Sequence, residues 1–325
     1  MKAVSEPRIV ALGGGTGLST LLRGLKKYTP HLTAIVTVTD DGGSSGALRR
    51  ELGVLPPGDI RSCLVALSEE ENLMAQLFQY RFPYVGSLAG HSFGNLFLTA
   101  MSSLAGGFDA GIARVSEVLA IRGRVLPSTL RYVTLKAKLS DGTIVRGESI
   151  ISKSRLRIDT LSLDPYPPPA APQVIEAIEE ADVIVMGPGS LYTSVIANLL
   201  VTDIRNALQK AKAPVIYVCN IMTQPGETSR YLVSDHLEAI DKHAGKGMLD
   251  YVVVNNGTIP KKVAVRYARE CSYPVRLDKR NANGIGIVRA NLVTKDKFIR
   301  HDADTLAKII MKIAGKKHAR AKQHD

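Results

Sequence analysis

Residues 8–17, with the sequence RIVALGGGTG, decide the fold: a strand-like apolar run ends directly in a glycine-rich turn. A second stretch of the same kind, DVIVMGPGS, covers residues 182–190. A helical pattern follows each stretch. A strand, a glycine turn and a helix start together bring bare backbone N–H groups and the positive end of a helix dipole to one place, and such a place binds phosphate. The chain therefore predicts a site for two phosphates, or for one diphosphate held from both sides.

The composition fits a globular protein with a basic surface. Hydrophobic residues make up 45% of the 325-residue chain, which is enough to fill a core. The formal net charge is +12; the last ten residues hold four basic residues and one aspartate, so +9 remains in the rest. A basic surface suits an anionic ligand. Because the chain has no tryptophan and only 5% aromatic residues, it offers few stacking platforms, and we expect no nucleic-acid partner.

The cysteines and the apolar runs indicate the compartment. Cys63, Cys219 and Cys271 lie far apart and form no C-x-x-C pair, which is typical of a reducing compartment and gives no metal-binding spacing. No apolar run approaches the length that spans a membrane, and the N-terminus has no apolar signal core. We therefore expect a cytoplasmic protein without a membrane span.

Strand-like runs alternate with helical patterns along most of the chain, which predicts a mainly parallel sheet with helices on both faces. The segment 133–151 differs, because apolar and polar residues alternate on either side of Asp141-Gly142, a strong hairpin signal. We predict a Rossmann-like α/β fold in a single domain, residues 1–315, with a β-rich insertion at about 124–160. Residues 316–325 are expected to form a basic, disordered tail.

Polar or glycine-rich clusters follow the ends of the predicted strands. They are residues 13–17, 39–46, 187–190, 220–228 and 255–258. In an open parallel sheet, ligands bind outside the carboxyl ends of the strands, so all five clusters should crowd one edge. The first turn is neither a dinucleotide fingerprint, since Leu18 and Thr20 stand where a third glycine is needed, nor a Walker A loop. A tight turn without a ligand is the alternative.

Asp40 and Asp41 are candidates for chemistry. They follow the second strand, where Rossmann proteins place a carboxylate for a ribose hydroxyl. Paired carboxylates also suit Mg²⁺ bound against phosphate oxygens. An Asx-type turn before Gly42-Gly43 is the structural alternative.

Two further groups of residues can each be interpreted as structural or as functional. Asp59 follows Pro-Pro-Gly and is predicted to cap a helix, with Arg61 in its first turn to meet an anion. His91, Ser92 and Asn95 place three hydrogen-bonding side chains within one turn at a predicted helix start, as either a site or a structural joint.

Five motifs in order carry a family resemblance: GGGTG at 13–17, TDDGGSSG at 39–46, PPGDIR at 56–61, GHSFGN at 90–95 and GPGSLYTS at 187–194. Over residues 8–314 the chain resembles the bacterial gluconeogenesis factor family, which is CofD-like, that is, related to 2-phospho-L-lactate transferase. The resemblance implies a Rossmann-like fold. It also implies binding of UDP-sugars, notably UDP-N-acetylglucosamine, and a link to cell shape and wall-precursor supply during gluconeogenic growth. Tyr267 and Arg300 are similar to that family's sugar-nucleotide contacts.

From these observations we expect a cytoplasmic regulator that binds a nucleoside diphosphate sugar. The expected ligand-binding residues are Gly13, Gly14, Gly15, Thr16, Gly17, Asp40, Asp41, Ser92, Asn95, Gly187, Pro188, Gly189, Ser190, Asn220, Tyr267 and Arg300. Asp40 and Asp41 are the candidates for Mg²⁺. The expected partners are a sugar nucleotide, a regulated enzyme of wall-precursor synthesis and a second copy of the chain in a homodimer.

Two other functions stay open. The first is a Mg²⁺-dependent phospholactyl transferase that acts on a guanosine diphosphate conjugate, as the transferase relatives do. Asp40, Asp59 and His91 would then arrange the metal and the acceptor. The second is a binder of NAD, which presents the same diphosphate and ribose hydroxyls. No hydride-transfer residues can be named for it.

Overall fold

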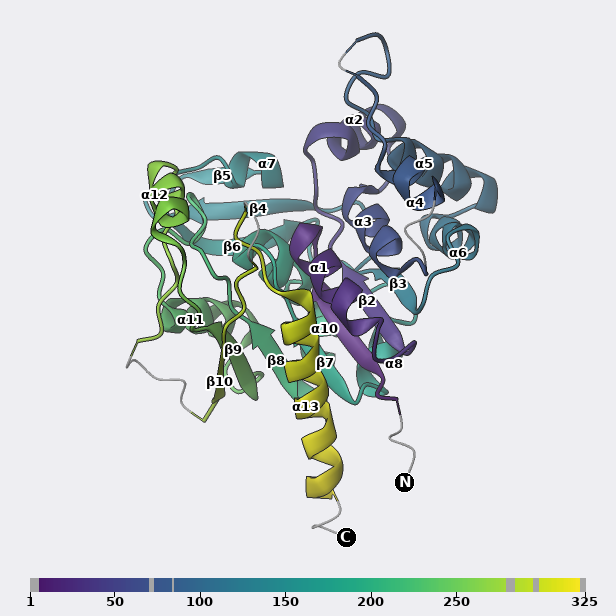
Figure 1. The fold of residues 1–325 in the computed structure, drawn as a ribbon. Helices are drawn as coiled ribbons and strands as arrows, with labels where there is room; N and C mark the ends of the chain where they lie inside the picture. The colour runs from purple at the N-terminus through teal and green to yellow at the C-terminus, as the bar shows by residue number, and fades with distance from the viewer. Residues whose placement is uncertain (1–5, 70–72, 84, 279–283, 295–297, 322–325) are drawn as a thin grey trace.

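The computed structural model describes residues 6–69, 73–83, 85–278, 284–294 and 298–321, with only the backbone described for 316–321. Seven strands form the main sheet, and every neighbouring pair in it is parallel (Figure 1). They are β1 (Ile9–Gly13), β2 (Leu32–Val36), β3 (Arg124–Pro127), β7 (Val183–Met186), β8 (Val215–Val218), β9 (Tyr251–Asn255) and β10 (Gly286–Ala290).

The strand order of the main sheet is β10-β9-β8-β7-β1-β2-β3. The chain therefore builds outward in one direction from β1 to β3 and in the other from β7 to β10. This is the doubly wound order of Rossmann-type sheets, and the order reverses between β1 and β7. The two glycine-rich turns follow these two strands, so both lie at the topological switch point where such sheets bind ligands. The predicted fold class is confirmed.

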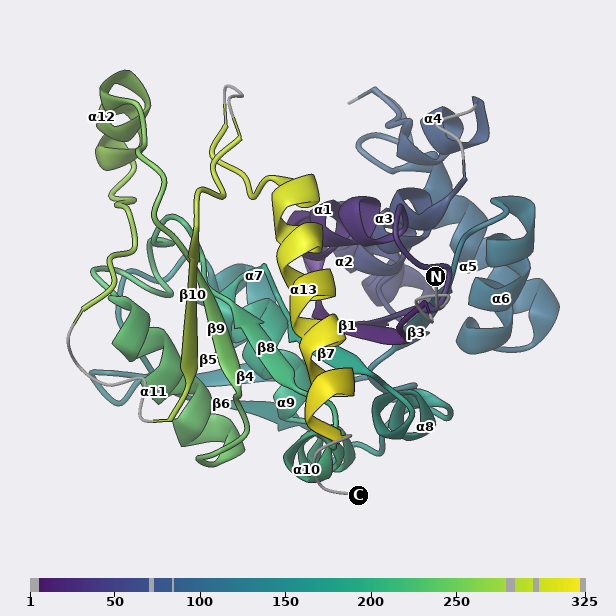
Figure 2. The same ribbon diagram turned by 60° about the horizontal axis from the view of Figure 1, so that its bottom comes forward.

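Alternate residues of each buried strand enter two separate cores. In β1, Ile9 and Ala11 face one core, and Val10 and Leu12 face the other. The first core lies under helices α1 (Gly15–Leu25), α3 (Gly58–Leu67), α5 (Phe93–Ala105), α6 (Phe108–Val118) and α13 (Ala303–Ala321). Figure 2 shows α13 running alongside α1 on this face. Period-two burial on both faces explains why the strand sequences are almost wholly apolar.

The second core is covered by a small antiparallel sheet together with helical segments. The small sheet has the order β5-β4-β6 and comprises β4 (Thr134–Leu139), β5 (Ile144–Arg146) and β6 (Ile158–Asp164). The helical segments are α8 (Val174–Glu179), the π-helix η1 (Leu191–Ile196), α9 (Ala197–Leu199), α10 (Thr202–Lys210) and α11 (Val233–Ala244). The remaining helices are α2 (Gly43–Leu52), α4 (Leu73–Gln79), α7 (Glu148–Ile151) and α12 (Lys261–Arg269).

Two segment boundaries differ from the sequence expectation. Residues 124–127, predicted as part of the β-rich insertion, form β3 of the main sheet, and the antiparallel strands lie within 134–164. The hairpin turn at Asp141-Gly142 is confirmed. The last helix includes Gly315 and continues to Ala321, so it enters the segment predicted as a basic tail; residues 322–325 lie outside the described part. The division into one domain and a tail stays a prediction.

No single helix in the described ranges is long and apolar enough to cross a membrane. In the part of the chain that the structure describes, α5 and α6 taken together would qualify by length and composition, and they are bent by 118° at their junction.

Candidate functional site

A pocket of about 470 Å³ opens where the turns after β1 and β7 meet, and we call it the glycine pocket. Its lining comes from both turns, from the segment after β8, from α12 and from the segment before α13. The lining residues are Gly14, Gly15, Thr16, Gly17, Thr20, Pro188, Gly189, Ser190, Ser194, Asn220, Ile221, Met222, Gln224, Tyr267, Phe298, Ile299, Arg300 and His301.

The two glycine turns are in direct backbone contact. A Cβ atom at Gly17 would overlap the carbonyl of Pro188 and would lie 3.0 Å from the Gly189 nitrogen. Gly15 has a φ of +62°, which favours glycine. Asn198 ties the first turn to α9, since its Nδ2 donates to the Gly13 carbonyl at 3.1 Å. The turns therefore form one fixed cradle rather than two independent loops.

Backbone donors at this cradle suit an anion. Helix α1 begins after Gly14, and η1 begins after Ser190; neither residue makes a side-chain cap hydrogen bond in the described structure. The first turn of each also lacks acidic residues. Backbone N–H groups at such helix starts, with the positive end of the dipole, attract anionic groups. One N–H at each start already meets a carboxylate, because Gly15 donates to Asp59 and Tyr192 donates to Glu227.

The opposite wall of the glycine pocket carries polar and aromatic side chains. Gln224 donates from Nε2 to Ser190 Oγ at 2.8 Å, which ties the segment after β8 to the second turn. The hydroxyl of Tyr267 accepts a hydrogen bond from the Ile299 N–H at 3.0 Å, and the Arg300 guanidinium lies 5.9 Å from the centre of the Phe298 ring. The Oδ1 atom of Asn220 is buried without a hydrogen-bond partner in the described part. This wall offers a free acceptor and a cation to a ligand.

His301 forms the floor near this wall. Its Nε2 lies 3.1 Å from the Cys219 carbonyl oxygen, a distance at which an Nε2–H donates to that oxygen. Although the residue keeps some exposure to the pocket, protein atoms surround the imidazole, and this desolvation lowers its pKa to about 4. The imidazole is therefore neutral at physiological pH.

The structure places ten of the sequence-predicted ligand residues in the glycine pocket and six outside its lining. Those in the lining are Gly14, Gly15, Thr16, Gly17, Pro188, Gly189, Ser190, Asn220, Tyr267 and Arg300. Those outside are Gly13, Asp40, Asp41, Ser92, Asn95 and Gly187. Gly13 and Gly187 support the turns from beneath, because the Gly187 Cα lies 3.9 Å from an ideal Cβ at Gly13.

Asp59 does not cap its helix. It is the second residue of α3, whose N-cap position is Pro57, and its carboxylate accepts a hydrogen bond from the Gly15 N–H instead. Protein atoms surround the carboxyl group although the residue retains some exposure. This desolvation, and next the negative charge of Asp40, raise the pKa of Asp59 to about 6. Asp59 thus couples α3 to the first glycine turn.

The carboxylates of Asp40 and Asp41 point to different partners. Asp40 Oδ1 accepts from the Gly42 N–H at 2.9 Å, which is an Asx-type turn, and Asp41 Oδ1 accepts from the Ser149 N–H at 2.8 Å at the start of α7. Within the described ranges, no three His, Cys, Asp or Glu side chains form a metal-binding group. The two carboxylates hold different backbone segments, and their role as ligands of Mg²⁺ stays a prediction.

His91, Ser92 and Asn95 meet at one hydroxyl group. Ser44 Oγ lies 3.2 Å from His91 Nδ1 and accepts hydrogen bonds from the Ser92 N–H at 3.3 Å and from Asn95 Nδ2 at 3.1 Å. This geometry joins the start of α2 to the start of α5. It favours the structural interpretation of the motif, and its catalytic role stays a prediction.

Comparison with known proteins places the chain in a family. The family model described as 2-phospho-L-lactate transferase CofD matches residues 9–293. The chain is 47% identical over 309 residues to the gluconeogenesis factor of Bacillus subtilis, covering 94% of this chain and 98% of that protein. The chain belongs to the gluconeogenesis factor family of CofD-like proteins. It is also 43% identical over 319 residues to the gluconeogenesis factor of Listeria monocytogenes, covering 96% of this chain and 97% of that protein.

A solved structure agrees with this family and with the fold. The crystal structure of a member of the UPF0052 family from Bacillus halodurans is 48% identical and has a TM-score of 0.92, covering 95% of this chain and all of that chain.

Several residues of this gluconeogenesis factor family member were missed by sequence reasoning. Glu148 accepts a hydrogen bond from Thr39 Oγ1 at 2.8 Å, and desolvation followed by the charges of Asp59 and Asp40 raises its pKa well above the usual value. Glu227 is buried and accepts from the Tyr192 N–H at 3.2 Å, and its pKa is raised by desolvation. Gln224, Phe298, Ile299 and His301 were also missed as pocket residues, although Gln224 falls in one of the clusters at strand ends.

Proposed function

We propose that the glycine pocket binds a nucleoside diphosphate sugar, with UDP-N-acetylglucosamine as the expected ligand, and that the protein acts as a cytoplasmic regulator. The observation that carries this proposal is the backbone contact between the two glycine turns at the switch point. It makes one cradle from two helix starts, which matches the two phosphates of a diphosphate.

The other walls of the pocket suit the rest of such a ligand. Arg300 supplies a cation, and Asn220 Oδ1 is an unpartnered acceptor that would receive a ribose, base or sugar donor. A volume of about 470 Å³ lies within the range of small-molecule sites. The name of the relatives, gluconeogenesis factor, supports a link to gluconeogenic growth, and we propose in addition a role in cell shape and wall-precursor supply. The proposed partners are a regulated enzyme of wall-precursor synthesis and a second copy in a homodimer.

Calorimetric titration with UDP-N-acetylglucosamine tests the proposal, with GDP and NAD as competitors, with and without Mg²⁺. We expect saturable binding that weakens at least 10-fold in Arg300→Ala, because a charge-assisted contact is worth about 1.5–3 kcal/mol. Arg114→Ala is the matched control, since Arg114 pairs with Glu117 on the exposed face of α6. Absence of UDP-N-acetylglucosamine binding, together with Mg²⁺-dependent GDP binding, would contradict the proposal that the protein is a regulator that binds UDP-sugars.

A CofD-like transferase is the second candidate, and one observation favours it. A carboxyl group with a pKa of about 6, that of Asp59, lies directly against Gly15 of the glycine pocket. Such a group is suited to accepting a proton from an acceptor hydroxyl near neutral pH. Mg²⁺-dependent consumption of a guanosine diphospholactate, lost in Asp59→Asn, would favour this function. No consumption with a range of acceptors would leave binding as the better account.

A further inference from the structure

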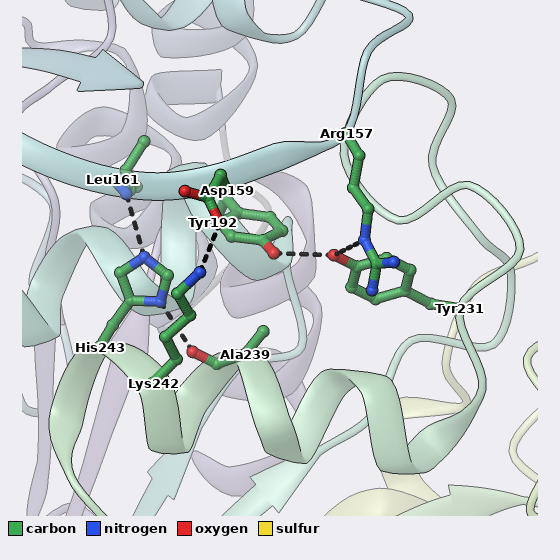
Figure 3. A network of polar contacts seen from close by, with 8 residues as sticks. All are labelled: Arg157, Asp159, Leu161, Tyr192, Tyr231, Ala239, Lys242 and His243. Carbon is green, nitrogen blue, oxygen red and sulfur yellow. Dashed lines mark hydrogen bonds and ion pairs between the residues drawn. The ribbon is translucent and has the colours of Figure 1, made fainter. Parts of the chain in front are cut away.

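A second pocket, of about 600 Å³, lies between the small antiparallel sheet and α11, and it shares no lining residue with the glycine pocket. We call it the tyrosine pocket, because Tyr192 and Tyr231 line it and are both buried. Their hydroxyl groups are 2.8 Å apart. Figure 3 shows the two hydroxyls facing each other, with Arg157 beside Tyr231 and Lys242 reaching from α11 toward Asp159.

Most acidic groups of the tyrosine pocket already have local partners. Asp159 pairs with Lys242 at 2.6 Å. Asp141 accepts from the backbone and the hydroxyl of Thr143, both at 2.9 Å, and Asp235 accepts from the Leu232 N–H at 2.7 Å. Lys242 balances the charge of Asp159, and hydrogen bonds from neutral donors occupy Asp141 and Asp235, which remain charged. Glu238 makes no hydrogen bond or ion pair within the described ranges, so one acceptor is left for a ligand.

Two cations of the tyrosine pocket lack a carboxylate partner within ion-pair distance in the described structure. Arg157 donates from Nε to the Tyr231 hydroxyl at 3.4 Å, and its guanidinium lies 5.0 Å from the centre of that ring. Its two terminal nitrogens are therefore held in place and remain available as donors. Lys138 lines the same pocket from β4 and is exposed. Two cationic donors that line one pocket can together recognise a phosphate group.

We propose that the tyrosine pocket binds a phosphorylated monosaccharide. Arg157 and Lys138 would donate to the phosphate oxygens, and Glu238 would accept from sugar hydroxyls. The tyrosine rings, with buried Leu139 and Ile158, would meet the apolar face of the sugar ring. The volume suffices for one hexose phosphate. This inference does not depend on the ligand of the glycine pocket.

The π-helix η1 connects the two pockets physically. Tyr192 lines the tyrosine pocket and Ser194 lines the glycine pocket, and both belong to this six-residue segment. Glu227 holds the segment by accepting from the Tyr192 N–H at 3.2 Å and from Thr193 Oγ1 at 3.4 Å. A ligand in the tyrosine pocket therefore contacts the helix that carries the second glycine turn.

Calorimetry on the full chain tests the proposal with glucose 6-phosphate, glucose 1-phosphate and fructose 6-phosphate. We expect at least one of them to bind at least 10-fold more tightly than inorganic phosphate, and glucose itself to bind more weakly still. The double variant Lys138→Gln/Arg157→Gln should weaken binding at least 10-fold, and Arg157→Lys with Lys138 intact should recover part of it. Lys153→Gln, which changes an exposed lysine outside the pocket lining, should bind as the unchanged protein does.

Two further measurements keep the outcome decisive. Thermal melting should show that the double variant is folded, since both side chains are exposed. Arg300→Ala should leave hexose phosphate binding unchanged, because Arg300 belongs to the glycine pocket. The proposal is overturned if none of the three hexose phosphates binds, if inorganic phosphate binds equally well, or if Arg300→Ala rather than the double variant abolishes binding.

Discussion

Gly17 of helix α1 lies against the backbone of Pro188, so closely that an ideal Cβ at position 17 would stand 2.7 Å from the Pro188 carbonyl carbon. The two residues are 171 positions apart, and each belongs to the turn after one of the two strands at the switch point. Only a hydrogen atom fits between them. The close contact explains why the first turn needs a glycine here even though it is not a dinucleotide fingerprint.

Gly17→Ala should therefore push the two turns apart. Overpacking of a well-packed contact costs about 1–3 kcal/mol, and we expect a lower melting temperature together with weaker UDP-N-acetylglucosamine binding. Gly315→Ala is the matched control, because no atom lies within 4 Å of a Cβ at that position in α13. The control should raise stability by up to about 1 kcal/mol through helix propensity. If both variants melt alike, the contact at Gly17 does not constrain the cradle.

Asp59 should make the protein less stable as the pH rises. Its folded pKa of about 6 exceeds the ordinary value of 3.8, so the folded state holds the proton more tightly than the unfolded state. The resulting stabilisation is complete below about pH 4 and is lost between about pH 4 and 6, by at most about 3 kcal/mol. Asp59→Asn cannot ionise, so above pH 6 it should melt at a higher temperature than the unchanged protein.

Asp141→Asn is the control for this prediction, and its effect on stability has the opposite sign. The pKa of Asp141 is lowered by hydrogen bonds from Thr143, so Asp141→Asn should lose a small stabilisation above about pH 4. Melting curves between pH 4 and 8 distinguish the two variants. A difference between Asp59→Asn and the unchanged protein that does not grow from pH 4 to pH 6 would contradict the prediction.

The titration of His301 should make the protein less stable as the pH falls, which is opposite to the effect of Asp59. Its folded pKa of about 4 lies below the ordinary 6.5, so its contribution to stability is present above about pH 6.5 and is lost as the pH falls toward 4. The loss amounts to at most about 3 kcal/mol, since the imidazole also borders the pocket. In His301→Gln, the amide can still donate to Cys219 and does not take up a proton. We expect the free energy of unfolding of this variant to fall less steeply with decreasing pH than that of the unchanged protein. Denaturant titration at several pH values measures this difference.

Much of the fold could be predicted because its signals are local. The apolar runs and the glycine turns at 13–17 and 187–190 mark β1, β7 and the helices that follow. The start of the last helix also has a local signal, because Asp302 directly precedes it and its Oδ1 accepts from the Thr305 N–H at 2.7 Å. The strand order was not predictable from these patterns, because each strand–helix–strand unit can extend the sheet on either side.

The errors concern residues whose roles depend on distant partners. Asp59 has the local pattern of a helix cap, and only its contact with Gly15, 44 positions away, reveals its role. Glu148 lies in the β-rich segment, yet it hydrogen-bonds Thr39 across 109 positions. His301 reaches Cys219 across 82 positions. No local pattern encodes such pairs, whereas the clusters that directly follow strands were placed correctly at one edge of the sheet.

Tyr267 provides the last prediction, on how the far wall of the glycine pocket is held. Its hydroxyl accepts from the Ile299 N–H at 3.0 Å and so fixes the segment that carries Arg300. Tyr267→Phe removes this acceptor and keeps the ring, so we expect UDP-N-acetylglucosamine binding to weaken about 5- to 10-fold, which corresponds to roughly 1 kcal/mol for one hydrogen bond.

Tyr273→Phe is the matched control for Tyr267→Phe, because Tyr273 is 46% exposed and lies outside the pocket lining. Both variants should melt within a few degrees of the unchanged protein, since a change of about 1 kcal/mol moves the midpoint of a chain this large by only a few degrees. Titration calorimetry then separates the two. Equal affinities in the two variants would show that Tyr267 does not position Arg300, and the role of this wall would rest on Arg300 alone.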